Sequence, residues 1–148
     1  IVKAASEVEE TFEVLNQQEG YNITFSKCRS AYVYGDYDKL KQVMANLISN
    51  AVKYCGEDRY IHIELKKVGR SVRFDVIDHG DGIAAEEISH VWERYYRTSA
   101  NRNRNIEGTG LGLSIVKGIL SLHNANYGVE SEEGNGSDFW FELNTVRK

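Results

Sequence analysis

Residues 42–54, QVMANLISNAVKY, constrain the fold most, because their apolar side chains recur at the i, i+3, i+4, i+7 spacing of an amphipathic helix. Asp36 stands just ahead of this pattern as the expected N-cap, and Gly56 follows its end. An apolar face of this length has to be buried against other elements. We therefore expect this helix to lie at the centre of a folded domain.

The same helix carries a polar stripe. Asn46, Asn50 and Lys53 are spaced i, i+4, i+7, so they lie one above another along one edge. Two amides and an ammonium beside an apolar face can hold oxygens, phosphates or a hard cation. The alternative is an ordinary solvated helix face. The helix alone does not decide between these two interpretations.

Two later stretches, residues 60–66 and 71–78, alternate apolar and polar residues with the period of two that is typical of strands. In the second stretch this period places Asp78 on the same face as the buried apolar residues. A buried carboxylate without a partner is costly, so Asp78 needs donors from the nearby backbone or from a ligand. Gly80 and Gly82 follow at once and permit tight turns and close approach to a ligand, which favours the ligand.

Residues 108–112, GTGLG, open the helical stretch LSIVKGILSLH. The free N–H groups and the positive dipole end at a helix start favour an anion. By itself this loop is a weak signal, because it matches neither the P-loop, nor the dinucleotide fingerprint, nor the glycine loop of protein kinases. The preceding residues 97–107 are polar, contain three arginines and lack periodicity, which is typical of a functional lid.

Strand pairs that alternate with helices predict an α+β two-layer sandwich, with a mixed sheet on one side and three helices on the other. A chain of 148 residues fits one domain, so we take 1–148 as a single unit. The remaining predicted elements are helices at 2–19 and 84–96 and strands at 22–26, 31–34, 126–131 and 137–143.

Composition excludes several classes of function. The net charge of -4 gives no overall basic field, so we expect no nucleic-acid partner. No apolar run approaches the length of a membrane span, so we do not expect the chain to be membrane-inserted. Cys28 and Cys55 lack metal-site spacing and are interpreted as apolar fillers in a reducing compartment. The chain begins mid-pattern without an initiator Met, and we expect it to be a fragment of a longer protein.

Four motifs, NLISNAVKY, DHGDG, WERYYR and GTGLGLSIVK, follow one another in an order and spacing that resemble a known family. They resemble the N, G1, F and G2 boxes of the catalytic ATP-binding domain of sensor histidine kinases. That domain belongs to a superfamily that also contains the gyrase, Hsp90 and MutL ATPases. The resemblance covers nearly the whole chain and implies a Bergerat-type ATP-binding fold, in which a mixed, mostly antiparallel sheet packs against three helices.

The resemblance also implies roles for the matching residues, with ATP and Mg²⁺ as cofactors. Asn50 is implied as the Mg²⁺ ligand, and an amide oxygen suits this hard cation. Asp78 is implied to accept a hydrogen bond from the adenine amino group. Catalytic roles are implied for Asn46, Asn50, Lys53 and Arg97. The residues implied to contact the nucleotide are Asn46, Asn50, Lys53, Tyr54, Asp78, Gly80, Gly82, Ile83, Arg97, Gly108, Thr109, Gly110, Leu111 and Gly112.

Asn46 bears on which member of the superfamily the chain resembles. The members that hydrolyse ATP carry Glu at the matching position as a general base, and an amide cannot take that proton. We therefore expect a protein-histidine kinase domain that binds Mg-ATP and donates the γ-phosphate to a histidine. The alternatives are an ATPase clamp of the gyrase or Hsp90 type and a non-catalytic nucleotide-binding module. Asn46 could also be a purely structural amide.

The phosphoacceptor histidine of this family lies in a separate helical domain, and none of the four histidines here has that sequence context. We therefore expect a dimerisation and histidine phosphotransfer domain upstream, in a full-length homodimer. A response regulator receiver domain is the expected downstream partner. We expect the domain to be cytoplasmic, as the inner portion of a membrane-anchored sensor.

Overall fold

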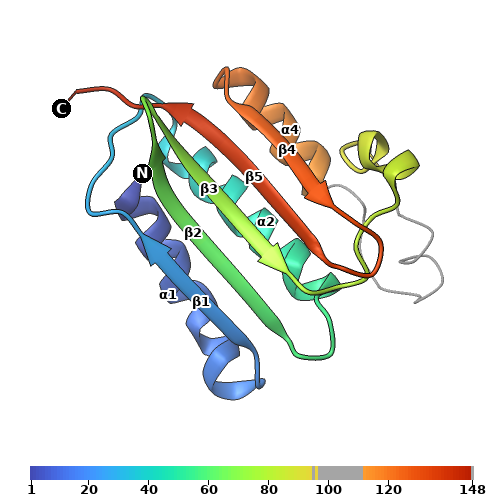
Figure 1. The fold of residues 1–148 in the computed structure, drawn as a ribbon. Helices are drawn as coiled ribbons and strands as arrows, with labels where there is room; N and C mark the ends of the chain where they lie inside the picture. Colours follow the sequence, from blue (N-terminus) through green and yellow to red (C-terminus); the bar gives the residue numbers. More distant parts are fainter. Residues whose placement is uncertain (95, 97–111, 148) are drawn as a thin grey trace.

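The computed structural model describes residues 1–94, 96 and 112–147, and shows a sheet with helices on one face (Figure 1). The predicted two-layer α+β sandwich is confirmed. The helices are α1 (Val2–Gln18), α2 (Tyr37–Tyr54) and α4 (Gly112–Leu122), with a 3₁₀ turn η1 (Ala85–His90). The strands are β1 (Asn22–Lys27), β2 (Tyr60–Val68), β3 (Ser71–Asp78), β4 (Asn126–Ser131) and β5 (Ser137–Asn144).

The strands lie in the order β1-β2-β3-β5-β4. Only β1 and β2 run parallel, and the other three neighbouring pairs are antiparallel. A tight turn at Gly69, where φ is +60°, joins β2 to β3. β3 is the central strand, and its last residue, Asp78, lies opposite Ile61 on β2 and Ser137 on β5. The topology therefore brings the end of β3 beside the start of β5.

Helix α2 is the core helix, as its apolar stripe predicts. The Asp36 carboxylate accepts a hydrogen bond from the Lys39 backbone N–H at 3.0 Å, which confirms the expected N-cap. The helix ends at Tyr54, one residue before Cys55. Its buried face packs against β3 and against α4. The fully buried side chains of α2 are Leu40, Val43, Met44, Leu47, Ile48 and Ala51.

Two predicted elements are wrong. Residues 31–34 form no strand, because their backbone bonds go to chain ends: the Ile1 amine donates to Ala31 O, and Val146 N–H donates to Tyr32 O. Ala31 is buried, but the aromatic Tyr32 and Tyr34 that suggested a strand are exposed. In the described part of the predicted helix over 84–96, the chain instead forms η1 followed by turns. Hydrogen bonds join residues three apart, as in Glu87 N–H to Ala84 O at 2.9 Å, which defines a tighter turn than an α-helix.

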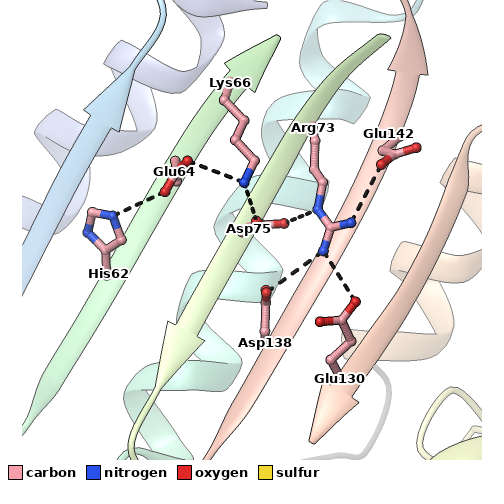
Figure 2. Close-up of polar contacts among 8 residues, drawn as sticks. All are labelled: His62, Glu64, Lys66, Arg73, Asp75, Glu130, Asp138 and Glu142. Carbon is pink, nitrogen blue, oxygen red and sulfur yellow. Dashed lines mark hydrogen bonds and ion pairs between the residues drawn. The ribbon is translucent and has the colours of Figure 1, made fainter. Parts of the chain in front are cut away.

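The sheet face away from the helices carries a charged network that centres on Arg73 (Figure 2). The guanidinium lies 4.4 Å from the Trp140 ring centroid, and its Nε lies 2.6 Å from Asp75. Three further carboxylates surround it at 3.6–3.8 Å, those of Glu130, Asp138 and Glu142. The four acids therefore outnumber the single guanidinium, and this face of the sheet is polar rather than apolar.

Candidate functional site

A pocket lies between the C-terminal half of α2, the end of β3, the start of β5 and the segment around η1. It contains about 570 Å³ of empty space, part of which is open to solvent. Its walls combine apolar side chains with a few polar groups, the usual character of a small-molecule site. The residues lining it are Asn50, Tyr54, Asp78, Asp81, Gly82, Ile83, Val91, Tyr96, Leu113, Ser137 and Phe139.

Asp78 is the buried carboxylate of this pocket, and its side chain takes the inward direction that the strand period predicts. The residue is only 5% exposed, and its Oδ1 accepts a hydrogen bond from the Gly80 backbone N–H at 2.8 Å. Burial raises the pKa of Asp78 to about 6, while hydrogen bonds from the Gly80 and Ser137 backbone oppose the rise. An acceptor held in an apolar pocket in this way suits a ligand that brings an N–H donor.

Gly80 and Gly82 are required by backbone packing on either side of the loop. A Cβ on Gly80 would lie 2.0 Å from the Tyr54 carbonyl oxygen, at the end of α2. A Cβ on Gly82 would lie 2.1 Å from the Glu132 carbonyl oxygen, and this glycine has φ of +73°. The loop after β3 is thus wedged between α2 and the β4–β5 connection. Gly82 lines the pocket, whereas Gly80 is buried beneath it.

The polar stripe of α2 reaches the pocket only in part. Asn50 and Tyr54, one turn apart, line it. Asn46 is half-buried one turn earlier and Lys53 is exposed, and neither belongs to the lining that the described residues form. Ile83 lines the pocket and is buried. The structure therefore brings together five predicted site residues: Asn50, Tyr54, Asp78, Gly82 and Ile83.

Sequence reasoning missed the contribution of β5. Ser137 and Phe139 alternate on its inner face and line the pocket, because β5 pairs with β3 and sets Ser137 opposite Asp78. The Ser137 hydroxyl lies 2.9 Å from the Ser131 hydroxyl, which accepts the Ile83 N–H at 2.8 Å. This contribution depends on which strand lies beside β3. The remaining unpredicted lining residues are Asp81, Val91, Tyr96 and Leu113.

Five predicted site residues, Arg97, Gly108, Thr109, Gly110 and Leu111, lie outside the described residues. Gly112 begins α4, as the glycine loop predicts, and it is exposed. Within the described ranges, no three His, Cys, Asp or Glu side chains gather to hold a metal ion, and no helix has the length and apolarity needed to cross a membrane.

Proteins of similar sequence include sensor proteins and sensor histidine kinases. The phosphate regulon sensor protein PhoR of Haemophilus influenzae is 35% identical over 129 residues, which cover 87% of this chain and 30% of PhoR. The sensor histidine kinase WalK of Bacillus subtilis is 34% identical over 145 residues, which cover 97% of this chain and 24% of WalK. The chain thus spans less than a third of the length of these curated relatives.

Solved structures of histidine kinases share the fold of this chain. The catalytic domain of histidine kinase ThkA superposes with a TM-score of 0.82 at 28% identity, over 98% of this chain and 94% of that domain. Full-length ShkA, solved in complex with AMPPNP, superposes with a TM-score of 0.83 at 26% identity, over 99% of this chain and 30% of ShkA. These likenesses confirm the predicted fold and the resemblance to histidine kinase catalytic domains.

A family comparison covers most of the chain. Residues 35–147 match the model described as histidine kinase-, DNA gyrase B- and HSP90-like ATPase. This span includes α2, β3 and β5, the elements that supply Asn50, Asp78 and Ser137 to the pocket. The chain therefore belongs to the family of histidine kinase-, DNA gyrase B- and HSP90-like ATPases, as a nucleotide-binding domain of the histidine kinase type.

Proposed function

We propose that the chain is the phosphodonor domain of a two-component sensor histidine kinase. It binds Mg-ATP in the pocket beside Asp78 and presents the γ-phosphate to a histidine on a separate dimerisation domain. The observation that carries this proposal is the buried Asp78 carboxylate in a pocket that combines apolar walls with other polar side chains. The relatives that are sensor histidine kinases support it as well.

The base end of the pocket fits adenine in shape and in chemistry. Adenine is flat and apolar on both faces, and Ile83, Val91 and Phe139 offer apolar walls. Its exocyclic amino group is a donor, and Asp78 supplies the acceptor. Burial still disfavours the ionised Asp78 carboxylate despite its backbone hydrogen bonds, so a further donor from a ligand would recover part of that free energy. Asp78 would therefore favour a 6-amino purine over purines that carry an acceptor at that position.

The phosphate end is proposed to lie toward the polar stripe of α2 and the start of α4. Asn50 offers an amide oxygen, which fits Mg²⁺ as one ligand beside phosphate oxygens and water. Lys53 would add a point charge, and the N-terminus of α4 at Gly112 would add its dipole. The metal would offset the negative charge of the triphosphate, while the protein groups orient it for in-line transfer.

Transfer is favoured over hydrolysis by the residue type at Asn46. A primary amide has no basic site for the proton of an attacking water, so a bound γ-phosphate would persist. A persistent γ-phosphate suits a domain that waits for its acceptor. Asn46 and Arg97 therefore remain proposed site residues, Asn46 near the phosphates and Arg97 toward the terminal phosphate.

The experiment that tests this function supplies the acceptor separately. We would mix the chain with a purified histidine-bearing dimerisation domain and γ-labelled Mg-ATP, and follow acid-labile, base-stable label. The expected result is label on the acceptor histidine, and none on an acceptor in which that histidine is glutamine. Rapid ATP hydrolysis by the chain alone would instead indicate an ATPase clamp. Nucleotide binding without any label would indicate a non-catalytic module.

The proposed assembly follows from that reaction. The dimerisation domain would belong to the same full-length protein, which we propose to be a homodimer. A response regulator receiver domain would then take the phosphoryl group from the histidine. We place this phosphorelay on the cytoplasmic side of a sensor. Co-purification of the full-length protein with its receiver domain, dependent on the acceptor histidine, would check the arrangement.

A further inference from the structure

The loop after α2 and the loop after β3 meet at the edge of the pocket, where their backbones contact each other directly. A Cβ on Gly56 would lie 2.3 Å from the His79 carbonyl oxygen, and a Cβ on Gly80 would lie 2.0 Å from the Tyr54 carbonyl oxygen. These distances leave no room for a side chain at either glycine, so the two backbones lie directly against each other. A side-chain interaction across this junction would fix the position of one loop relative to the other.

Asp58 and His79 provide that interaction. Asp58 Oδ2 lies 2.6 Å from Nδ1 of His79, and Asp58 Oδ1 accepts the Tyr60 backbone N–H at 3.0 Å. The Tyr60 ring stacks on the imidazole, with centroids 4.7 Å apart and planes 20° from parallel. The His79 contact is the largest of several influences that lower the pKa of Asp58. Each loop thus contributes one partner to the pair.

The pair lies outside the hydrophobic core and outside the pocket lining that the described residues form. The two side chains are about half exposed, at 52% for His79 and 49% for Asp58. Neither residue belongs to the pocket lining. Yet His79 is covalently next to Asp78, and Gly80, which follows it, donates the backbone hydrogen bond that fixes Asp78 Oδ1. A displacement of His79 would therefore move both the carboxylate and its donor.

We infer that Asp58 and His79 form a positioning pair that holds Asp78 at the place where it recognises the adenine amino group. The inference rests on the proposed binding of ATP, and it extends that proposal to two residues outside the pocket. The pair acts on base selectivity, because it positions the acceptor for the base and touches nothing at the phosphate end. It is a connection between loops, so either partner alone is insufficient.

The experiment compares ATP with inosine triphosphate, which carries a carbonyl in place of the amino group. Dissociation constants for both nucleotides are measured by calorimetry on the wild-type chain, on His79→Ala, on Asp58→Ala and on the double variant. An exposed charge-assisted pair predicts a loss of ATP affinity of about fivefold in each single variant, with no further loss in the double variant. Affinity for inosine triphosphate is expected to stay within about twofold by the same reasoning.

Two further variants separate positioning from general destabilisation. His79→Asn keeps an N–H donor near the place of Nδ1, so it should restore ATP selectivity. His62→Ala removes a half-buried histidine that hydrogen-bonds Thr24 at 2.7 Å on another part of the sheet, and it should leave both affinities unchanged. Thermal melts show whether each variant is folded. If His79→Ala does not fold, the ATP selectivity of His79→Asn compared with that of Asp58→Ala still tests the inference.

The outcomes for the pair and for the proposed function are distinct. If the wild-type chain binds inosine triphosphate as well as ATP, adenine recognition by Asp78 is wrong and the pair has nothing to position. If the wild-type chain prefers ATP and the folded pair variants keep that preference, the positioning inference alone is overturned. Equal weakening of both nucleotides would also overturn it, because that is the behaviour of a purely structural pair.

Discussion

The Asp78 carboxylate destabilises the free chain and is also the proposed recognition group for ATP. Its burial raises its pKa to about 6, because the ionised carboxylate is less favourable in the pocket than in water. A rise of about two pH units corresponds to about 3 kcal/mol of unfavourable free energy in the folded chain. The same burial makes the carboxylate a selective acceptor for a ligand that brings a donor.

Asp78→Asn is therefore expected to stabilise the free chain while it weakens ATP binding. Because the folded pKa lies above the unfolded value, the wild type loses stability as pH rises from about 4 through 6, and the amide does not. The melting temperature of the variant should exceed that of the wild type at pH 7.5, and the gap should close toward pH 4. Glu133→Gln, which neutralises an exposed carboxylate in the neighbouring loop, should show no such gap.

A gap that stays constant between pH 4 and pH 7.5 would contradict this account of Asp78. It would mean that burial of the ionised carboxylate is not what destabilises the folded chain.

Asn50 is the second residue for which a single substitution is informative. Asn50→Asp puts a full negative charge beside the proposed triphosphate, and we expect roughly tenfold weaker nucleotide binding without Mg²⁺. With Mg²⁺ the loss should be smaller, because the cation lies between the charges, while the rate of phosphotransfer falls. Calorimetry with and without the metal measures both effects. Asn126→Asp, an exposed change on β4, is the control, and an unchanged Asn50→Asp would remove Asn50 from the site.

At the scale of elements, the site depends on how closely the loops pack. Gly80→Ala would place a Cβ 2.0 Å from the Tyr54 carbonyl oxygen, so the end of α2 or the loop after β3 must shift. Overpacking of this kind costs about 1–3 kcal/mol, and the shift should also weaken ATP binding. Gly118→Ala in α4 meets no atom within 4 Å and should instead stabilise by about 0.5–1 kcal/mol. Urea unfolding of both variants gives the comparison.

A Gly80→Ala variant as stable as the wild type would show that the loop after β3 can move away from α2 at no cost. That result would contradict the close backbone packing on which the pocket rests.

The sequence was most informative about elements whose pattern is local. The stripe of α2, the alternation of β3 and the apolar spacing of α4 are each set by residues within the element, and these helices and this strand are confirmed. Residues 31–34 were wrongly predicted as a strand because aromatic and β-branched residues also occur in irregular segments such as this one, where Tyr32 and Tyr34 are exposed. The segment around η1 misled because apolar spacing over so few residues does not distinguish a 3₁₀ turn from an α-helix.

The pocket itself could be predicted only in part. Asp78 and Asn50 were found because strand and helix periods fix the side on which each lies. Ser137 and Phe139 were not found, because they join the pocket only through the β3–β5 pairing, which no local pattern specifies. Lys53 belongs to the polar stripe of α2 but is exposed. Of the three residues in that stripe, only Asn50 lines the pocket that the described residues form.

At the scale of the whole molecule, the helix-free face of the sheet holds more acids than bases (Figure 2). Asp138 shows the consequence. Its Oδ1 is buried without a hydrogen-bond partner in the part of the chain that the structure describes. Burial is the largest cause that raises its pKa to about 7, and the Asp75 carboxylate adds to the rise. This face is therefore least stable where all of its carboxylates are ionised.

Asp138→Asn is expected to raise the melting temperature at pH 8, because it removes a carboxylate whose ionised form is disfavoured by burial and whose Oδ1 lacks a hydrogen-bond partner among the described residues. The folded pKa again lies above the unfolded value, so the wild type loses stability as pH rises toward and through 7. The advantage of the variant should thus begin near pH 4, as for Asp78→Asn, but continue to grow to a higher pH. Glu142→Gln removes a partner 3.6 Å from Arg73 and should give no gain. Equal melting temperatures of Asp138→Asn and wild type at pH 8 would contradict the argument.

The structure of the chain with Mg²⁺ and a non-hydrolysable ATP analogue tests the central claim most directly. The account predicts the adenine amino group within hydrogen-bond distance of the Asp78 carboxylate, about 2.7–3.2 Å. It further predicts the base between the apolar walls of Ile83 and Phe139 and the phosphates toward Asn50 and the start of α4. A base bound away from Asp78, or a nucleotide bound with its phosphates at Asp78, would contradict it.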